Sequence, residues 1–157
     1  MSVPSGKGEW FRAVASVTIA CLLVMGPAGG TAAGEERVGP RRHMLSLTNA
    51  DRASHERRAL SFAERLSRYA KLHSQAMADR GYLFHSTGDQ LRAALGGYEW
   101  ELGGENIGVG GSLEGLEEAF MASPPHRQNL LRRVYQHAAF GIVRQDGQTW
   151  ITVIFYG

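Results

Sequence analysis

Residues 103–129 read GGENIGVGGSLEGLEEAFMASPPHRQN, and this stretch decides the fold. Its first glycines predict a tight turn that carries Glu105. Ser112 is typical of a helix cap, and an amphipathic pattern follows it. The Ser-Pro-Pro-His-Arg step that begins at Ser123 ends this helix and starts the next, because proline suits a first helical turn. We therefore expect Glu105 and His126 at the edges of regular elements, where scaffolds present functional side chains.

The rest of the chain predicts helices packed around a small sheet. Residues 139–145 and 148–156 flank Asp146-Gly147, which is a hairpin turn signature. The second of these segments is apolar on both faces, which indicates that helices cover both sides. Apolar residues recur at helical spacing over 62–80 and stop at Gly81. With shorter helices over 43–51 and 89–95 and a short strand over 98–102, the predicted class is α+β, with a small antiparallel sheet between helices.

Residues 1–33 resemble a secretory signal peptide that precedes one domain. Lys7 and Arg12 precede an apolar run over 13–25, and small residues follow. The run is too short to span a bilayer comfortably, although an uncleaved anchor is the alternative. We expect residues 34–43 to form a linker and residues 44–157 to form the domain. The single cysteine, Cys21, lies in the leader, so the mature chain would fold without disulfides, which favours a secreted bacterial protein.

The charge of the mature chain is nearly balanced. Without residues 1–33 it keeps 15 of the 17 basic and 14 of the 15 acidic residues, a net charge of +1. This balance argues against nucleic acid or an anionic membrane surface as a partner. No second hydrophobic segment follows the leader, so we expect no membrane span after cleavage, and we expect a monomer.

Two histidines and one acid are the strongest candidates for chemistry. We expect His85, Glu105 and His126 to converge on one cleft, although their separations are too long for a local motif. Such a set is common in divalent-metal and acid/base sites. The helix dipole would favour a neutral imidazole at His126, the form that binds metals. The alternatives are an exposed helix start for His126 and a structural carboxylate, held by backbone amides, for Glu105.

Other polar residues near these candidates have structural interpretations. His73 lies on the apolar face of the long helix and is expected to have a backbone partner. Arg127 and Asn129 are expected to orient the turn at 103–106 or to cap helix ends. Ser123 suits a helix cap, while a Ser-His pair with His126 lacks the surrounding G-x-S-x-G. H-E-x-x-H is also absent from the chain.

Taken together, these motifs resemble the CAP superfamily of cysteine-rich secretory proteins, antigen 5 and plant pathogenesis-related proteins. The similarity is to the bacterial cysteine-free branch, often called SCP-like extracellular proteins, and covers about residues 44–157. It depends on Asn49 and Arg52, on A-x-x-H-x-x-x-M-A from Ala70, on G-Y-x-F-H-S from Gly81, on Gly104-Glu105-Asn106-Ile107, on M-x-S-P-x-H-R-x-N-L from Met121, and on the final hairpin.

The resemblance implies an α-β-α sandwich and a cleft formed by His85, Glu105 and His126, with Ser123 and Asn106 beside them. In some members the histidines hold a divalent cation such as zinc, which would make His85 and His126 the metal ligands here. The second acid of the plant and animal site falls near Ser123, so the four-residue site is incomplete. Family members have been linked to sterol or lipid binding, signalling, defence and proteolysis.

Three hypotheses for function follow. The favoured one is a secreted, non-enzymatic module that binds a small ligand, a lipid or a cell-envelope component, with a cleft suited to a divalent cation. The second is a metal-assisted hydrolase of peptides or cell-envelope polymers, with Glu105 as general base. The third is a lipid, sterol or adhesion module. The incomplete site and the lack of a hydrolase motif favour the non-enzymatic hypothesis.

Overall fold

The computed structural model describes residues 39–157, and the expected signal peptide and residues 34–38 of the expected linker lie outside this range. The described elements are α1 (Pro40–Ser54), β1 (Ser61–Phe62), α2 (Leu66–Arg80), α3 (Gly88–Leu95), β2 (Gly103–Gly110), α4 (Leu113–Ala122), α5 (Pro124–Leu130), β3 (His137–Gln145) and β4 (Gln148–Tyr156). The helix α1 begins inside the segment expected to be a linker. Pro40 accounts for this, because proline needs no hydrogen-bond partner in a first helical turn.

The four strands form one sheet in the order β1-β3-β4-β2. The predicted hairpin of β3 and β4 is confirmed, and its two-residue turn has φ values of 52° at Asp146 and 75° at Gly147. Strand β2 pairs antiparallel with β4 over its whole length. Strand β1 pairs parallel with β3 over two residues, so the sheet is mixed and not wholly antiparallel as expected.

The glycine-rich stretch that was expected to be a turn is instead a strand. Residues 103–106 begin β2, whereas residues 98–102, expected as a strand, form none. A Cβ atom at Gly103 would lie 2.6 Å from Leu95 of α3, and one at Gly108 would lie 3.1 Å from the ring of Phe120 of α4. These glycines therefore let helices pack close to a strand, a use of glycine that competes with the turn interpretation.

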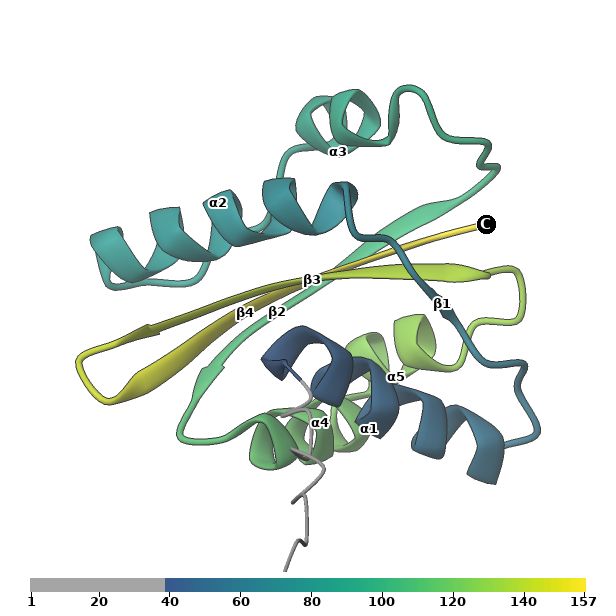
Figure 1. Ribbon diagram of the computed structural model, residues 1–157, viewed down its shortest axis with the longest axis horizontal. Coiled ribbons are helices and arrows are strands. Elements are labelled where there is room, and N and C mark those ends of the chain that lie inside the picture. The colour runs from purple at the N-terminus through teal and green to yellow at the C-terminus, as the bar shows by residue number, and fades with distance from the viewer. Residues whose placement is uncertain (1–38) are drawn as a thin grey trace, which may run out of the picture. The chain divides into compact units, whose positions relative to one another are not determined.

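Helices cover both faces of the sheet, which confirms the predicted α-β-α sandwich. Helix α2 packs on β3 and β4 from one side, while α1, α4 and α5 pack on the other (Figure 1). A Cβ atom at Gly141 would overlap the carbonyl of Ala70, so α2 lies directly on β3 at this point. The predicted C-terminal boundary of α2 is correct, since Gly81 has a φ of 73°.

Strand β4 is buried on both faces, as its apolar pattern predicts. Val153 and Phe155 belong to the cluster under α1 and α4, whereas Ile154 and Tyr156 belong to the cluster under α2. The polar Thr152 is also buried, and the hydroxyl of Ser74 donates a hydrogen bond to it at 2.9 Å. The core therefore continues through the sheet.

Two charged side chains are buried on the α1 side of the sheet. The guanidinium of Arg52, which is 0% exposed, donates hydrogen bonds to the backbone carbonyls of Arg58, Leu130, Arg132 and Tyr135. It thereby joins α1 to the segment that follows α5. Glu117 of α4 is 3% exposed, and neither of its carboxyl oxygens has a hydrogen-bond partner among the described residues. No helix within residues 39–157 is both long enough and apolar enough to cross a membrane.

Candidate functional site

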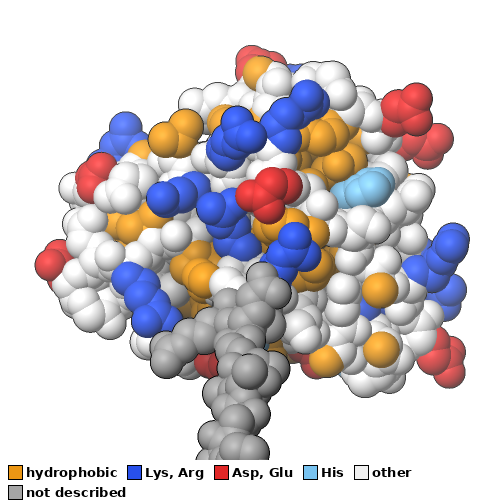
Figure 2. All heavy atoms as spheres, viewed as in Figure 1, with side chains coloured by type: hydrophobic (Ala, Val, Ile, Leu, Met, Phe, Trp, Pro, Cys, Tyr) orange, Lys and Arg blue, Asp and Glu red, His pale blue; other side chains and the backbone are white. Residues whose placement is uncertain are grey.

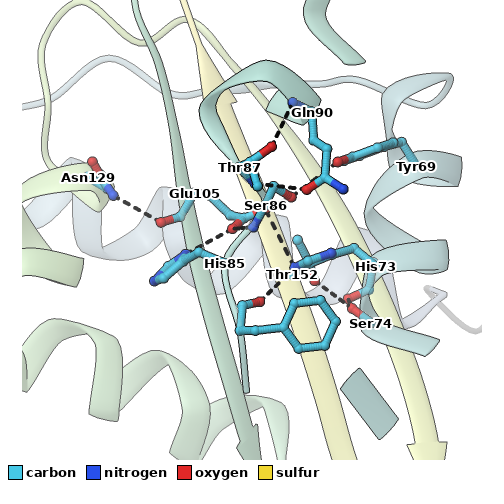
Figure 3. A network of polar contacts seen from close by, with 12 residues as sticks. Tyr69, His73, Ser74, His85, Ser86, Thr87, Gln90, Glu105, Asn129 and Thr152 are labelled. Atoms are coloured by element: carbon cyan, nitrogen blue, oxygen red, sulfur yellow. Dashed lines mark hydrogen bonds and ion pairs between the residues drawn. The ribbon is translucent and has the colours of Figure 1, made fainter. Parts of the chain in front are cut away.

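The carboxylate of Glu105 is the centre of the candidate site. Its Oε1 atom accepts hydrogen bonds from His85 Nδ1 at 2.8 Å and from the backbone N–H of Ser86 at 2.9 Å. Its Oε2 atom accepts from the Ser86 hydroxyl at 2.7 Å (Figure 3). The Glu105 side chain is 5% exposed. Both oxygens are therefore satisfied by the segment that leads into α3, as a buried carboxylate requires.

This segment is itself held in place by α2 and α3. Thr87 and Gln90 form a reciprocal capping box at the start of α3, which fixes the backbone immediately after Ser86. The hydroxyl of Tyr69 from α2 donates to the Ser86 hydroxyl at 3.2 Å. A chain of hydrogen bonds thus runs from Tyr69 through Ser86 to Glu105 (Figure 3). The position of Glu105 consequently depends on both helices.

The imidazole of His85 lies at the surface above this buried acid. Its side chain is 57% exposed, compared with 5% for Glu105. Because the carboxylate accepts at Nδ1, this nitrogen carries the hydrogen in the neutral ring, and Nε2 keeps a free lone pair. An exposed imidazole with this tautomer can bind a cation or accept a proton through Nε2. The carboxylate orients the ring for either role.

His73 supports the same segment from α2. Its Nε2 atom donates to the carbonyl of Phe84 at 2.8 Å, and its ring meets the Phe84 ring edge to face at 5.0 Å. The same nitrogen lies 4.0 Å from Glu105 Oε2. His73 therefore contacts a backbone carbonyl and also borders the acid at the centre of the site. Because its side chain is 8% exposed, it is not open to a ligand from solvent.

The two asparagines connect α5 to β2. Asn106 is 0% exposed, and its side chain donates to the carbonyl of His126 at 3.1 Å. Asn129 donates to the Asn106 side chain at 2.9 Å and to the carbonyl of Glu105 at 3.3 Å. These contacts fix the start of α5 against the strand that carries Glu105. They place the backbones of Glu105 and His126 on neighbouring elements.

The ring of His126 is half-buried and packs against Phe120 with 5.1 Å between ring centroids. Burial lowers the pKa of His126, and the nearby charge of His85 lowers this pKa further. The neutral form expected from the helix dipole therefore has burial as its main cause.

Other predicted site residues lie apart from this centre. Ser123 stands at the junction of α4 and α5, but its side chain makes no capping hydrogen bond. Arg127 contacts the ring of His55 at 3.1 Å and does not bind β2, so of the pair expected to orient residues 103–106 it is Asn129 that contacts them. Within residues 39–157, no group of three His, Cys, Asp or Glu side chains is arranged to hold a metal ion.

Ser86 is the main contributor that sequence reasoning missed. It supplies two of the three hydrogen bonds to Glu105, one from its backbone and one from its hydroxyl. Its place next to His85 and one residue before a helix cap was the available signal. A serine before a cap is common, however, and nothing local in the sequence points to a partner 19 residues away.

Comparison with known proteins agrees with the fold and the motifs. Residues 45–156 match the family described as CAP, the cysteine-rich secretory protein family. The uncharacterized protein YkwD of Bacillus subtilis is 32% identical over 116 residues, which cover 69% of this chain and 44% of YkwD. The chain therefore belongs to the cysteine-rich secretory protein family. It spans less than half the length of this relative.

Solved structures show the same fold. An extracellular protein of Bacillus anthracis that contains an SCP domain superposes with a TM-score of 0.61 at 27% identity, over 75% of this chain and 40% of that one. An outer surface protein of Borrelia burgdorferi gives a TM-score of 0.65 at 18% identity, over 73% of this chain and 90% of that one. At 18% identity, the similarity to the Borrelia burgdorferi protein concerns the fold alone.

Proposed function

We propose that this chain is an extracellular, non-enzymatic binding domain whose site at His85, Glu105 and His126 takes a divalent cation such as zinc. The observation that carries the proposal is the 2.8 Å hydrogen bond from His85 Nδ1 to Glu105. A carboxylate in this position fixes the tautomer of a ligating histidine and raises its basicity. It leaves Nε2 of His85 as the metal-binding atom.

His126 supplies the second nitrogen in this proposal. Its lowered pKa favours the neutral imidazole near pH 7, which is the form that binds metals. With two protein ligands, the remaining coordination positions would belong to water or to a bound molecule. A carboxylate or phosphate on a small ligand, a lipid or a cell-envelope component could fill them, which makes the cation a part of ligand recognition.

The hydrolase hypothesis is weakened in the form that makes Glu105 a general base. Both oxygens of this carboxylate already accept hydrogen bonds, and the side chain is 5% exposed. If the site performs acid/base chemistry, the accessible base is Nε2 of His85. Hydrolysis of a peptide or peptidoglycan library that is lost in His85→Ala would support that alternative, and no turnover in the wild type would reject it.

An extracellular location is part of the proposal. It is supported by the sequence of residues 1–33 and by the B. anthracis structure, which is described as an extracellular protein. Expression of the full chain in a bacterial host, followed by fractionation, should recover the protein outside the cytoplasm. Retention in the cytoplasm, together with the same retention of a variant that lacks residues 1–33, would contradict it.

Zinc titration by calorimetry tests the cation directly. The wild-type domain should bind one zinc ion, and His85→Ala and His126→Ala should each reduce the affinity at least about 10-fold, because each removes one of two ligands. His43→Ala is the matched control, since His43 pairs with Glu114 at 2.6 Å on α1 and α4. A loss confined to this control, or equal binding in all four proteins, would exclude the proposed site.

A further inference from the structure

Five arginines gather at the end of the molecule where α1 and α5 both finish. Arg57 and Arg58 lie between α1 and β1, Arg127 lies on α5, and Arg132 and Arg133 follow α5. We call these five residues the arginine cluster. Figure 2 shows Lys and Arg side chains at the right-hand edge of the molecule, the side on which the chain passes from α5 to β3 in Figure 1. No role in the site at Glu105 accounts for them.

The buried Arg52 fixes the backbone that carries the cluster. It donates to the carbonyl of Arg58 at 2.8 Å on one side and to the carbonyl of Arg132 at 3.2 Å on the other. The guanidinium of Arg57 adds a bond to the carbonyl of Leu131 at 2.9 Å. The two segments are therefore joined to each other through their backbones, while the guanidinium of Arg132 is turned towards the ring of Tyr135, 5.8 Å from its centroid.

His55 brings Arg127 into the same surface. Its Nδ1 atom donates to the carbonyl of Asp51 at 2.8 Å, so Nε2 accepts from Arg127 at 3.1 Å. Arg57 donates to the backbone carbonyl of this same His55 at 2.9 Å. Arg127 also borders a surface hollow of about 320 Å³ between α4 and α5. Two guanidinium groups thus meet at His55, and one of them, that of Arg127, borders the hollow.

The cluster has no acidic partner within residues 39–157. None of its five arginines takes part in a described ion pair, whereas Arg41 and Arg92 pair with Glu64 and Asp89. Of the two acids nearest in the chain, Asp51 faces the buried Glu117, and Glu56 forms no described ion pair. The positive charge is therefore concentrated locally, although the whole chain has a net charge of only +2.

We propose that the arginine cluster is a docking surface for a linear polyphosphate chain, as distinct from a nucleic acid. A guanidinium binds a phosphate with two parallel hydrogen bonds. A phosphate also has oxygens in several directions, so one group can contact arginines from two segments. Arg58 and Arg133 are exposed and available for such contacts. Neither Arg58 nor Arg133 belongs to the proposed cation site.

The test is binding of labelled inorganic polyphosphate of defined length, measured by fluorescence anisotropy at several NaCl concentrations. The wild-type domain should bind, and its affinity should fall steeply with salt because bound counterions are released. The double variant Arg58→Glu/Arg133→Glu should lose at least about 10-fold in affinity, with a shallower dependence on salt. Both side chains are exposed, so circular dichroism should show an unchanged fold.

The matched control is Arg68→Glu/Lys71→Glu, which makes the same change of charge on exposed positions of α2, across the sheet. It should bind within about 2-fold of the wild type, apart from a small effect of net charge. An equal loss in both variants, or no binding by the wild type, would overturn the proposal. Tighter binding of duplex DNA, or of polyglutamate with the same number of charges, would also overturn it and identify another class of partner.

Discussion

Nδ1 of His85 lies 2.8 Å from Oε1 of Glu105, although the two residues are 20 positions apart in the chain. One is largely exposed and the other is buried. The buried carboxylate of Glu105 therefore fixes the orientation and the tautomer of the exposed His85 imidazole. Any binding or acid/base role of His85 depends on that arrangement.

Glu105→Gln should show how far the Glu105 carboxylate contributes to zinc binding and how far it contributes to the stability of the fold. The amide keeps the shape of the side chain but weakens the hydrogen bonds from His85 and Ser86, so we expect a loss of about 1–3 kcal/mol in stability. Zinc affinity should fall about 10- to 100-fold, the usual cost of losing a partner behind a ligand. Calorimetry and thermal melting measure the two effects. Ser86→Ala is the control, because it keeps the His85 contact and should affect stability more than zinc binding.

Arg52→Met should destabilise the fold strongly. The change leaves four backbone carbonyls without their donor, those of Leu130 and Tyr135 in buried hydrogen bonds, and we expect a loss of about 3–5 kcal/mol. Urea denaturation measures it. Arg68→Met, at an exposed position on α2, should stay within about 0.5 kcal/mol of the wild type. A similar small effect at both positions would contradict the role assigned to Arg52.

Gly141→Ala should disrupt the packing of α2 on the sheet. The added Cβ would overlap the backbone of Ala70, which cannot move without shifting the helix, so we expect a loss of about 3 kcal/mol, at the upper end of the usual cost of overpacking. Gly111→Ala is the matched control, because a Cβ there meets nothing within 4 Å. Chemical denaturation of the two variants should therefore give very different midpoints, and equal midpoints would refute this description of the interface.

Glu117 should make stability depend on pH. Burial raises the pKa of Glu117 to about 7, and the charge of Asp51 contributes, while the contact with Thr48 opposes the shift. The pKa in the unfolded chain is about 4.3, so the folded state holds this proton more tightly. The contribution of Glu117 to the free energy of unfolding is therefore highest below about pH 4, where Glu117 is protonated in both states. It falls by up to about 3 kcal/mol as the pH rises towards 7.

Glu117→Gln removes this titration. The variant should gain stability relative to the wild type as the pH rises from about 5 to 8, and the gap should stay constant at higher pH. Urea denaturation at a series of pH values measures the gap. A difference that does not change with pH would show that Glu117 is ionised in the folded protein at all these pH values.

The parts of the fold that followed from the sequence have local causes. Asp146-Gly147 supports its own turn, and Gly81 ends α2 because it alone adopts the required backbone conformation easily. The prediction of a turn at the start of β2 was wrong, because there the glycines serve contacts with other elements and not the local backbone conformation. Gly103 and Gly104 are needed by neighbours that are distant in sequence, Leu95 on one side and Tyr135 and Asn129 on the other. A pattern of glycines cannot distinguish these two needs.

The residues of the candidate site also fall into those that the sequence predicts and those that only the tertiary structure reveals. Residue type and motif pointed to His85, Glu105 and His126. Ser86 stands at the end of the G-Y-x-F-H-S motif, but a backbone N–H and a small hydroxyl gave no indication of the partner they bind. Glu117 lies among acids near the start of α4, and the sequence gives no sign that this one faces α1. Helix packing decides which polar side chains are buried, and a local sequence pattern does not contain that information.

The most direct test of the central claim is the protonation of the His85 ring in solution. Long-range ¹H–¹⁵N NMR of the wild-type domain near pH 7.5 should show the hydrogen on Nδ1, and zinc should shift the signal of Nε2. The account predicts that Glu105→Gln weakens this preference. A neutral His85 with its hydrogen on Nε2, or an Nε2 signal that zinc leaves unchanged, would contradict it.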